Sequence, residues 1–333
     1  MKVRLPSTHP GNRSERGAAL LTVLLLVAVL SVIAALMLER STLATRLAVN
    51  GADRETARWS ALGIEALAMR QITDLKRQGG RLPPIGLTPE GLQQQVPLER
   101  GAAEITVRDA ATCFNINSLV TGESGLLSTR PEAMEQFVRL ANIVQIDARD
   151  GRALAAAIAD WIDTDAQENP GGAEDGFYLR EDEPYRTAGQ LINDIGELRA
   201  VRGMDSVTFD RLRPWLCALP AAEMSRININ QVRQDQFPLI AMLLPSQYPL
   251  RRIREILATR PPQGFGSVFS FWQMVESGQP EVNAGVQQQA VLNTRWYGLE
   301  TRVTLGDAVL VERALIDGNI EPSRVVWRRW DSD

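Results

Sequence analysis

Histidine and cysteine are scarce in this chain of 333 residues. The single histidine, His9, lies close to the N-terminus, and the two cysteines are Cys113 and Cys217. The body of the chain after residue 38 therefore has no histidine. This excludes Ser-His-Asp and Cys-His nucleophile systems and histidine-ligated zinc sites from the body. A hydrolase built from it would have to use carboxylates alone.

Charge is absent from residues 18–38. At ~1.5 Å per residue, a helix of this length spans roughly 30 Å, the thickness of a bilayer's hydrocarbon core. Only a helix satisfies its own backbone there, so we predict a transmembrane helix over 18–38. Basic residues outnumber acidic ones before the helix, which keeps the N-terminus in the cytoplasm and exports the body. The basic residues are Lys2, Arg4, Arg13 and Arg16, and the one acidic residue is Glu15.

The exported body is acidic. After residue 38, 32 Lys and Arg side chains face 39 Asp and Glu side chains, which argues against a general surface for polyanions. Its two cysteines lie in an oxidising compartment, so we expect one disulfide, with free thiols as the alternative. Closing so long a loop would contribute ~4–5 kcal/mol in the chain-entropy model.

The basic leader ends in Arg16-Gly17, directly before the apolar run. A plain signal anchor or signal peptide is one interpretation, but a signal peptide has a shorter apolar core of ~7–15 residues. The leader resembles that of type IV prepilins, which a membrane prepilin peptidase cuts after the glycine. The resemblance implies removal of residues 1–17 and an N-methylated Ala18 as the new first residue.

Two positions depart from the usual prepilin pattern. Ala18 stands where most prepilins have Phe or Met, and Thr22 stands where most have Glu. The resemblance implies that this Glu pairs with the terminal amine of a neighbouring subunit in the filament. A subunit with Thr22 has no such carboxylate and can lie at the end of a stack. The K-type minor pseudopilins of type II secretion systems lack this Glu as a rule.

A stem helix is predicted over 39–78, continuous with the membrane helix, because apolar residues recur at helical spacing. Gly79-Gly80 and Pro83-Pro84 are expected to end it. The predicted apolar stripe consists of Ala57, Leu62, Ala66, Leu67 and Ile72.

The predicted strands lie at the two ends of the body. Residues 103–108 alternate like a half-buried strand, and 296–305, 308–316 and 324–330 form a meander joined by turn signals. A small sheet needs a helix on one face, and the stem is the natural candidate. The expected fold is α+β and pilin-like, with a β domain of residues 79–110 plus 291–333. A large inserted α-helical domain occupies residues 111–290.

The inserted domain is expected to contain two similar units. Asn115-Ile116-Asn117-Ser118-Leu119 recurs as Asn228-Ile229-Asn230-Gln231-Val232, and repeats of this kind indicate duplicated packing units. The Asn side chains are expected to cap or turn the chain. Helices are predicted over 131–144, 151–162, 189–201, 234–243, 250–260 and 268–276.

The segment Leu198–Asp205 resembles the turn of DNA-binding helix-hairpin-helix domains. It has the single glycine Gly203, and Asp205 would repel a phosphate. We expect a structural role for it. A membrane-anchored DNA receptor is the alternative, which the acidic body disfavours.

Nine carboxylates and one Arg lie between Asp160 and Glu183. So many like charges repel unless they are solvated or neutralised by a cation. Oxygen ligands at short spacing on a turning chain suit calcium, although the spacing is not that of an EF-hand. The predicted calcium ligands are Asp163, Asp165, Glu174 and Asp175, followed by Glu168 and Asp160; a solvated acidic loop is the alternative.

Several motifs together resemble the K-type minor pseudopilins (general secretion pathway protein K) of type II secretion systems, over essentially the whole chain. They are Cys-Phe-Asn-Ile-Asn-Ser-Leu from Cys113, Ala-Asp-Trp-Ile-Asp-Thr-Asp from Ala159, Gly-Gly-Ala-Glu-Asp from Gly171, Pro184-Tyr185-Arg186, and Gly196–Gly203.

The resemblance implies a pseudopilin fold with an inserted helical domain, calcium in the acidic loop and a disulfide between Cys113 and Cys217. It also implies a tip position with the I-type and J-type minor pseudopilins, above a shaft of the major G-type pseudopilin. We therefore expect a non-enzymatic subunit that nucleates or caps the filament exporting folded proteins across the outer membrane. It would cross the inner membrane once, hold its body in the periplasm and bind no nucleic acid.

Overall fold

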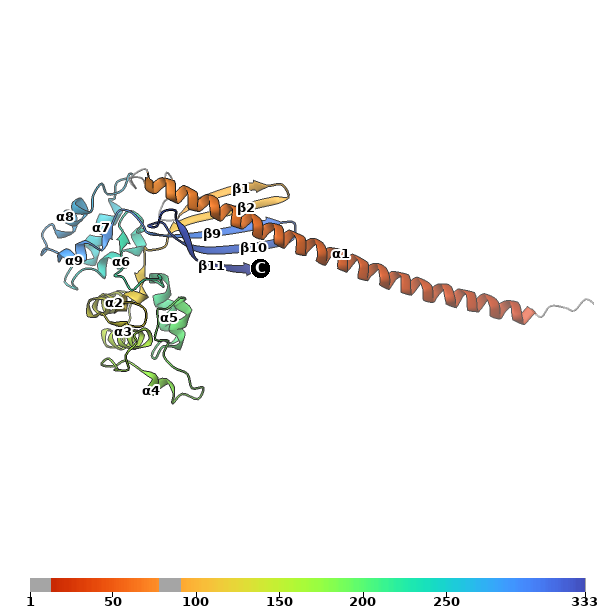
Figure 1. The fold of residues 1–333 in the computed structure, drawn as a ribbon, viewed down its shortest axis with the longest axis horizontal. Helices are drawn as coiled ribbons and strands as arrows, with labels where there is room; N and C mark the ends of the chain where they lie inside the picture. The colour runs from red at the N-terminus through yellow and green to blue at the C-terminus, as the bar shows by residue number, and fades with distance from the viewer. Residues whose placement is uncertain (1–12, 78–90, 333) are drawn as a thin grey trace, which may run out of the picture.

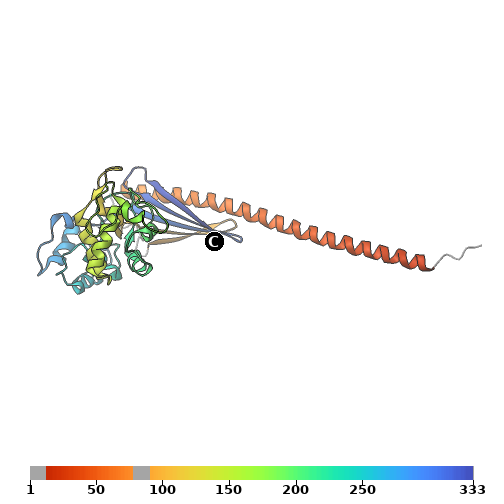
Figure 2. The same ribbon diagram turned by 90° about the horizontal axis from the view of Figure 1, so that it is seen from below.

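A single long helix organises the molecule. The computed structural model describes residues 13–77 and 91–332, and α1 (Arg13–Arg77) contains 65 of them. Its C-terminal part packs on a sheet, its N-terminal part projects alone, and a head of short helices lies at the opposite end (Figures 1 and 2). The leader residues 1–12, including His9, lie outside the described residues. So do residues 78–90, where the stem was predicted to end.

The predicted membrane helix and stem form one uninterrupted helix. Every side chain from Leu20 to Val49 is exposed, including the large apolar ones of the predicted membrane span. In the part of the chain that the structure describes, one helix is apolar and long enough to cross a membrane. Such a surface requires an apolar environment, which a bilayer provides.

The sheet is antiparallel throughout. Its strand order among the described residues is β1-β2-β9-β10-β11, so β2 and β9 pair although the whole inserted domain separates them in sequence. The three closing strands appear as predicted, but β1 was missed because Gln93-Gln94-Gln95 breaks any apolar alternation. The strands are β1 (Leu92–Leu98), β2 (Gly101–Asp109), β9 (Trp296–Leu305), β10 (Ala308–Asp317) and β11 (Arg324–Ser332).

Small residues bring α1 close to the sheet. The buried stripe of the helix is Ala57, Ala61, Ile64, Ala68 and Ile72, at near four-residue spacing. It packs against the inward face of β2, β9 and β10 in two apolar clusters. Alanine side chains at three of these positions allow the helix backbone to approach the strands closely.

The predicted stripe was only partly right. Ala57 and Ile72 are buried, but Leu62 is half-buried, and Ala66 and Leu67 are exposed. Leu67 keeps 62% of its surface. The prediction followed the larger apolar residues, whereas the sheet contacts the smaller ones.

Three charged side chains cross the helix–sheet interface. Arg328 on β11 donates to both carboxylate oxygens of Glu65 on α1, at 2.8 and 2.6 Å. Its Nε also lies 2.9 Å from Oε1 of Glu312 on β10, which is fully buried. Burial, and then the neighbouring Glu65, raise the pKa of Glu312 above its ordinary value. One guanidinium therefore forms ion pairs with two carboxylates.

The head consists of short helices and two-residue strands around one large apolar core. Its α-helices are α2 (Pro131–Ile143), α3 (Ala148–Ile162), α4 (Asp175–Tyr178), α5 (Ser206–Leu212), α6 (Pro238–Ala241), α7 (Leu250–Ala258), α8 (Val268–Glu276) and α9 (Ala284–Gln287). Its 3-10 turns are η1 (Ile116–Leu119), η2 (Ile195–Ala200), η3 (Arg213–Trp215) and η4 (Gln234–Gln236).

Two predicted helices differ from the structure. The helix over 189–201 was wrong: only the 3-10 turn η2 forms, started by a capping box between Asp194 and Glu197. The helix over 234–243 is divided into η4 and the short α6, because Pro238 begins a new turn. The remaining helices lie within two or three residues of their predicted bounds.

The repeated Asn-Ile-Asn motif has the same local geometry in both places. The Asn117 amide donates to Ile192 O and accepts from Ile192 N, both at 2.8 Å. The Asn230 amide forms the same pair with Phe265, at 3.3 and 2.7 Å. Each motif thus fixes a distant segment through both polar groups of one residue.

The strands around the motifs repeat as well. β3 (Phe114–Asn115) pairs in parallel with β6 (Leu216–Cys217), and β7 (Ile227–Asn228) pairs in parallel with β8 (Ala290–Val291). A separate antiparallel pair is formed by β4 (Val120–Thr121) and β5 (Ser128–Thr129). The first Asn of each motif accepts from the backbone N–H two residues later, which is the turn role predicted for it.

The Arg328 network makes a testable prediction. Arg328→Met leaves Glu65 and Glu312 without their cation and should destabilise the helix–sheet unit by about 2–4 kcal/mol, less than for a fully enclosed pair since Arg328 is partly exposed. Hydrogen-exchange mass spectrometry of the full chain in detergent should show faster exchange in β10 and β11. Arg324→Met, an exposed position on the same strand, is the control. Equal exchange in the two variants would contradict this role of Arg328.

Candidate functional site

A buried carboxylate organises the acidic loop that follows α3. Asp160 accepts from Asn169 N at 3.1 Å, from Asn169 Nδ2 at 2.6 Å and from Ala173 N at 2.7 Å. Gly172 is required beside it, because a Cβ there would lie 2.0 Å from Asp160 Oδ2. Burial raises the pKa of Asp160. Its interactions fold the loop back over the end of α3.

Three carboxylates meet where this loop turns. Oxygen atoms of Asp163, Asp165 and Glu174 all lie within 4.8 Å of one another. Oδ2 of Asp163 accepts from Thr129 Oγ1 at 3.1 Å, whereas Oδ1 of Asp163 and Oε1 of Glu174 are buried without a hydrogen-bond partner. Such orphaned oxygens are rare in folded proteins. The cluster could hold a metal ion.

The electrostatics of the cluster also fit a cation. Burial, followed by the neighbouring carboxylates, raises the pKa of Glu174 to about 7. Burial also raises the pKa of Asp163 to about 6, with Asp165 and Asp160 adding to the effect. Ionised carboxylates at this distance repel one another, and a bound divalent cation would neutralise them.

The other predicted ligands have different partners. Asp175 accepts from Thr187 N at 3.0 Å and Thr187 Oγ1 at 3.1 Å, and pairs with Arg186. Glu168 lies 3.9 Å from Arg202 Nη1, and Asp160 holds the loop. The structure therefore brings together Asp163, Asp165 and Glu174, and it does not bring Asp160, Glu168 or Asp175 into the cluster.

Thr129 on β5 was missed from the sequence. Its hydroxyl joins the two halves of the site, since it donates to Asp163 and accepts from Asn169 Nδ2 at 2.8 Å. It comes from a segment more than thirty residues before the loop. Its residue type and spacing carried no signal, because only the β4–β5 pairing places it there.

The predicted disulfide forms where the head joins the sheet. Cys113 and Cys217 are joined, with their Cα atoms 5.8 Å apart. The parallel pairing of β3 with β6 brings the two cysteines together. The bond therefore connects the point where the chain enters the head with the end of the segment that contains the acidic loop.

Asp109, the last residue of β2, lies at the same junction between the sheet and the head. Its Oδ1 accepts from Ala111 N at 2.7 Å and Thr112 N at 3.1 Å, where the chain leaves the sheet. It also accepts from Thr294 Oγ1 at 3.0 Å, where the chain returns to β9. Burial raises the pKa of Asp109 to about 6. One carboxylate thus connects both crossings between sheet and head.

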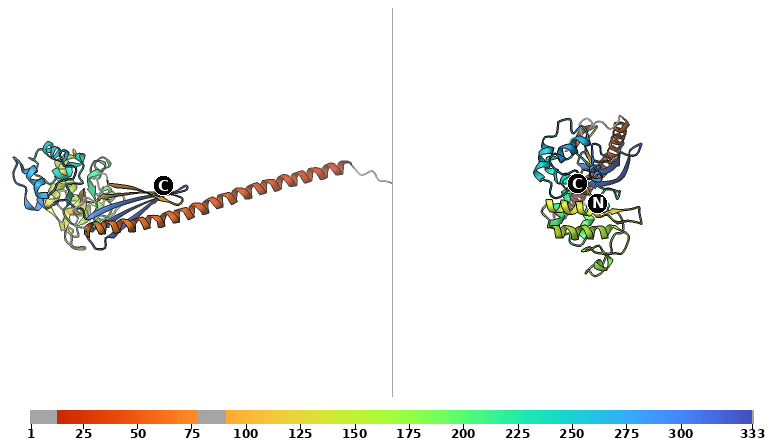
Figure 3. Two further views of the ribbon diagram at one scale, coloured as in Figure 1. Left: turned by 90° about the horizontal axis from the view of Figure 1, so that it is seen from above. Right: turned by 90° about the vertical axis from the view of Figure 1, so that its left-hand side faces the viewer.

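At the other end of the molecule, Gly17, Ala18 and Thr22 all lie within the continuous helix α1. Thr22 belongs to the exposed run. The helix brings these positions to its N-terminal end, far from the sheet and the head (Figure 3).

Comparison with known proteins assigns the family. Residues 112–221 match the family model for the type II secretion system (T2SS), protein K. A protein named type II secretion system protein K from Pectobacterium carotovorum subsp. carotovorum is 33% identical over 322 residues, covering 95% of this chain and 96% of that protein. The chain belongs to the type II secretion system protein K family. A protein of the same name from Klebsiella pneumoniae is 31% identical over 322 residues, covering 96% of this chain and 97% of the relative.

A solved structure shares the fold of this protein K family member. It is the crystal structure of the GspK-GspI-GspJ complex from the type 2 secretion system of enterotoxigenic Escherichia coli, with a TM-score of 0.69 and 25% identity. The match covers 84% of this chain and 97% of that chain. The resemblance to the K-type minor pseudopilins and the expected α+β fold are thereby confirmed.

The DNA-receptor alternative finds no support. Asp205 caps α5 by accepting from Thr208 N at 2.7 Å, and Gly203 supplies the positive φ of the preceding turn. The segment that resembles a helix-hairpin-helix turn therefore has the structural role expected for it.

The disulfide can be tested by removal. Cys113→Ser combined with Cys217→Ser frees a long loop in the unfolded state, so the head should lose about 2–4 kcal/mol of stability in urea denaturation. Wild-type protein reduced by dithiothreitol should lose the same amount and recover it on reoxidation. A double variant as stable as the oxidised protein would show that the β3–β6 pairing suffices.

Proposed function

We propose that this protein is the tip subunit of a type II secretion pseudopilus, where it nucleates or caps the filament that exports folded proteins across the outer membrane. The observation that carries the proposal is the position of the head. The helices of the inserted domain gather around the C-terminal end of α1, some beyond it and some beside it, and all lie at the end of the molecule opposite the apolar half of that helix (Figures 1 and 3).

A bulky head at this end favours a terminal position. In a filament of parallel α1 helices, the next subunit above would place its own helix and sheet over this end. The head fills that space, so the filament would end here. Thr22 agrees with this arrangement, because it brings no carboxylate that needs a partner amine within an apolar bundle.

The partners follow from the family and from the complex named above. We propose that this chain binds an I-type and a J-type minor pseudopilin, with the major G-type pseudopilin below them. A prepilin peptidase would cut between Gly17 and Ala18 and methylate Ala18. The exposed apolar helix, the basic leader and the disulfide support a single pass through the inner membrane with the body in the periplasm.

The acidic cluster is proposed to bind calcium. Asp163, Asp165 and Glu174 offer hard oxygen ligands, two of them with buried oxygens that lack partners. Backbone carbonyls and water complete the ~6–8 ligands of calcium in such sites. A cation there would hold the loop against the end of α3 and make the head more rigid. We propose a structural protein without catalytic activity of its own.

The domain limits remain part of the proposal. They are a leader of residues 1–17, a membrane helix of 18–38, a stem of 39–78, a β domain of 79–110 with 291–333, and a two-unit inserted domain of 111–290. The discontinuous sheet and the repeated Asn geometry support this division.

Calcium binding is tested by thermal unfolding of the full chain in detergent. Calcium at about 100 times its dissociation constant should stabilise the head by about 2.7 kcal/mol, and magnesium should stabilise it less because it demands a smaller octahedral site. Asp163→Asn combined with Glu174→Gln should remove the effect. Glu168→Gln is the matched control and should keep it. A calcium response that survives the double variant would rule out this cluster.

The terminal position is tested at Thr22. Thr22→Glu places a carboxylate in the apolar bundle without a subunit above to neutralise it, so secretion should fall and the filament tip should change. Thr22→Gln, of similar size but uncharged, should have a smaller effect. Mass spectrometry of both variants should find N-methylated Ala18 at the N-terminus, which shows that processing is intact. Unchanged secretion and filament length in Thr22→Glu would contradict the terminal position.

A further inference from the structure

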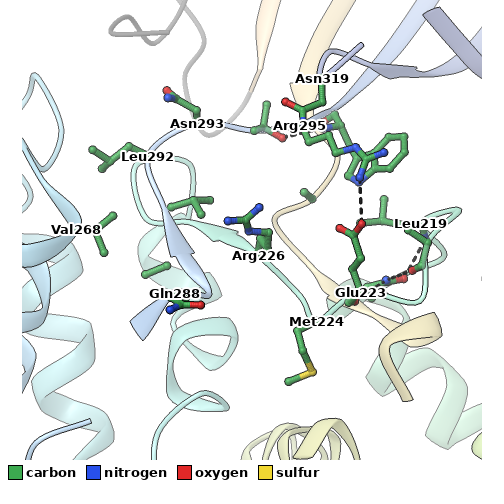
Figure 4. A pocket seen from close by; sticks show the side chains of 17 residues that line it. Leu219, Glu223, Met224, Arg226, Val268, Gln288, Leu292, Asn293, Arg295 and Asn319 are labelled. Atoms are coloured by element: carbon green, nitrogen blue, oxygen red, sulfur yellow. Dashed lines mark hydrogen bonds and ion pairs between the residues drawn. The ribbon is translucent and has the colours of Figure 1, made fainter. Parts of the chain in front are cut away.

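A cavity of about 600 Å³ lies where the head rejoins the sheet (Figure 4). Its walls are the segment 219–226, strand β8 with the chain that follows it to Trp296, the start of α8 at Val268, and Asn319 between β10 and β11. The volume is within the range of ligand sites in proteins, roughly 300–1,000 Å³. It is separate from the acidic cluster and from the disulfide.

One side of the cavity is formed by an arginine that already has its ion-pair partners. Arg295 lies 3.2 Å from Glu223 and 2.9 Å from Asp317, and its guanidinium stacks on the ring of Trp296 at 4.4 Å. Arg295 is thus shared between two carboxylates, so its own charge is fully used within the wall. Figure 4 shows the Glu223–Arg295 pair at one side of the opening.

Arg226 is the remaining charged side chain of the lining. It is exposed, and within residues 13–77 and 91–332 the structure gives its side chain no hydrogen bond or ion pair. Figure 4 shows it between Gln288 and the Glu223–Arg295 pair. The cavity therefore presents a guanidinium that has no direct partner among the described residues, in a body whose overall charge is negative.

The backbone on both sides of Arg226 is fixed. Ser225 is buried and accepts from Asn115 N at 2.8 Å. Ile227 is fully buried and donates its N–H to Gln289 O at 2.7 Å. Arg226 thus stands on a fixed backbone, so binding an anion would have to order its side chain alone.

The rest of the lining suits more than a small ion. Met224, Val268 and Leu292 are half-buried apolar side chains around the opening, and Gln288 supplies a side-chain amide. Ala290 and Val291 of β8 also line the cavity. Among the described strands, β8 pairs with β7 alone. A strand edge beside apolar side chains is how proteins receive an extended peptide.

We propose that this cavity binds a carboxylate side chain carried on an extended segment of another protein, with Arg226 as its charge partner. A guanidinium and a carboxylate form a charge-assisted, geometrically specific pair. The acidic surface elsewhere would repel such a segment, so binding is directed to this cavity. The proposal does not depend on the tip position.

The experiment is isothermal titration calorimetry with the full chain in detergent micelles. The probe is the peptide N-acetyl-Gly-Glu-Val-Gly-amide, compared with the same peptide carrying Gln in place of Glu. The acidic peptide should bind up to about fivefold more tightly than the neutral one, which is the gain that an exposed ion pair allows. Arg226→Gln should remove that preference. Arg149→Gln, an exposed arginine on α3 with the same loss of charge, should retain it.

Three results would overturn the proposal: no heat with the acidic peptide at millimolar concentration, equal affinities for the two peptides, or an Arg226→Gln variant that binds like wild type. Sodium acetate distinguishes the sources of the carboxylate. Acetate binding as tight as the peptide would assign the cavity to small anions and refute a protein segment. Unchanged thermal unfolding of Arg226→Gln, expected for an exposed side chain, shows that the variant is folded.

Discussion

The salt bridge of Arg328 with Glu65 and Glu312 constrains the whole architecture. A helix that packs through alanines has a smooth face, which by itself would tolerate sliding along the sheet. The three charged groups remove that freedom, because each lost contact would leave a buried charge unpaired. They join the helix to the last two strands of the chain and, together with the hydrogen bonds of Thr73 with Ser323, fix the register between the helix and the C-terminal strands.

The head, which the helix-and-sheet unit carries, is held together by polar side chains within an apolar core. Asn117 and Asn230 each hold a distant backbone segment through a donor and an acceptor. Asp160 holds the acidic loop by accepting hydrogen bonds alone. A buried amide that uses both polar groups tolerates little displacement, since a shift would leave one of them unpaired. The head therefore has a single arrangement although its helices are short.

Much of this fold could be predicted from the sequence. The uncharged run predicted the exposed apolar half of α1, the Val- and Trp-rich strands predicted the meander, and the two Asn-Ile-Asn motifs indicated repeated geometry. Residue size misled the prediction of the helix face, because Ala61 and Ala68 carry a weak hydrophobic signal although they are buried against the sheet. Strand β1 was missed because its three glutamines are exposed at the sheet edge, and only its second half, with Val96 and Leu98, packs against the core.

The acidic site shows a different limit. Spacing placed all six carboxylates near one loop, but it could not tell which of them would face inward. Asp160 and Asp175 are used by backbone amides and by Arg186, whereas Asp163 and Glu174 keep buried oxygens without partners. That division depends on where Thr129, Asn169 and Thr187 lie after folding, and local sequence does not contain this information.

The meeting of both chain crossings at Asp109 has an evolutionary consequence. A segment whose two ends emerge side by side can be lengthened, shortened or exchanged without moving the strands that carry it. The head is therefore an insertion that the helix-and-sheet unit can carry without rearrangement. Relatives with heads of different size are expected to differ in structure between residues 109 and 294. They are expected to share the helix and the sheet.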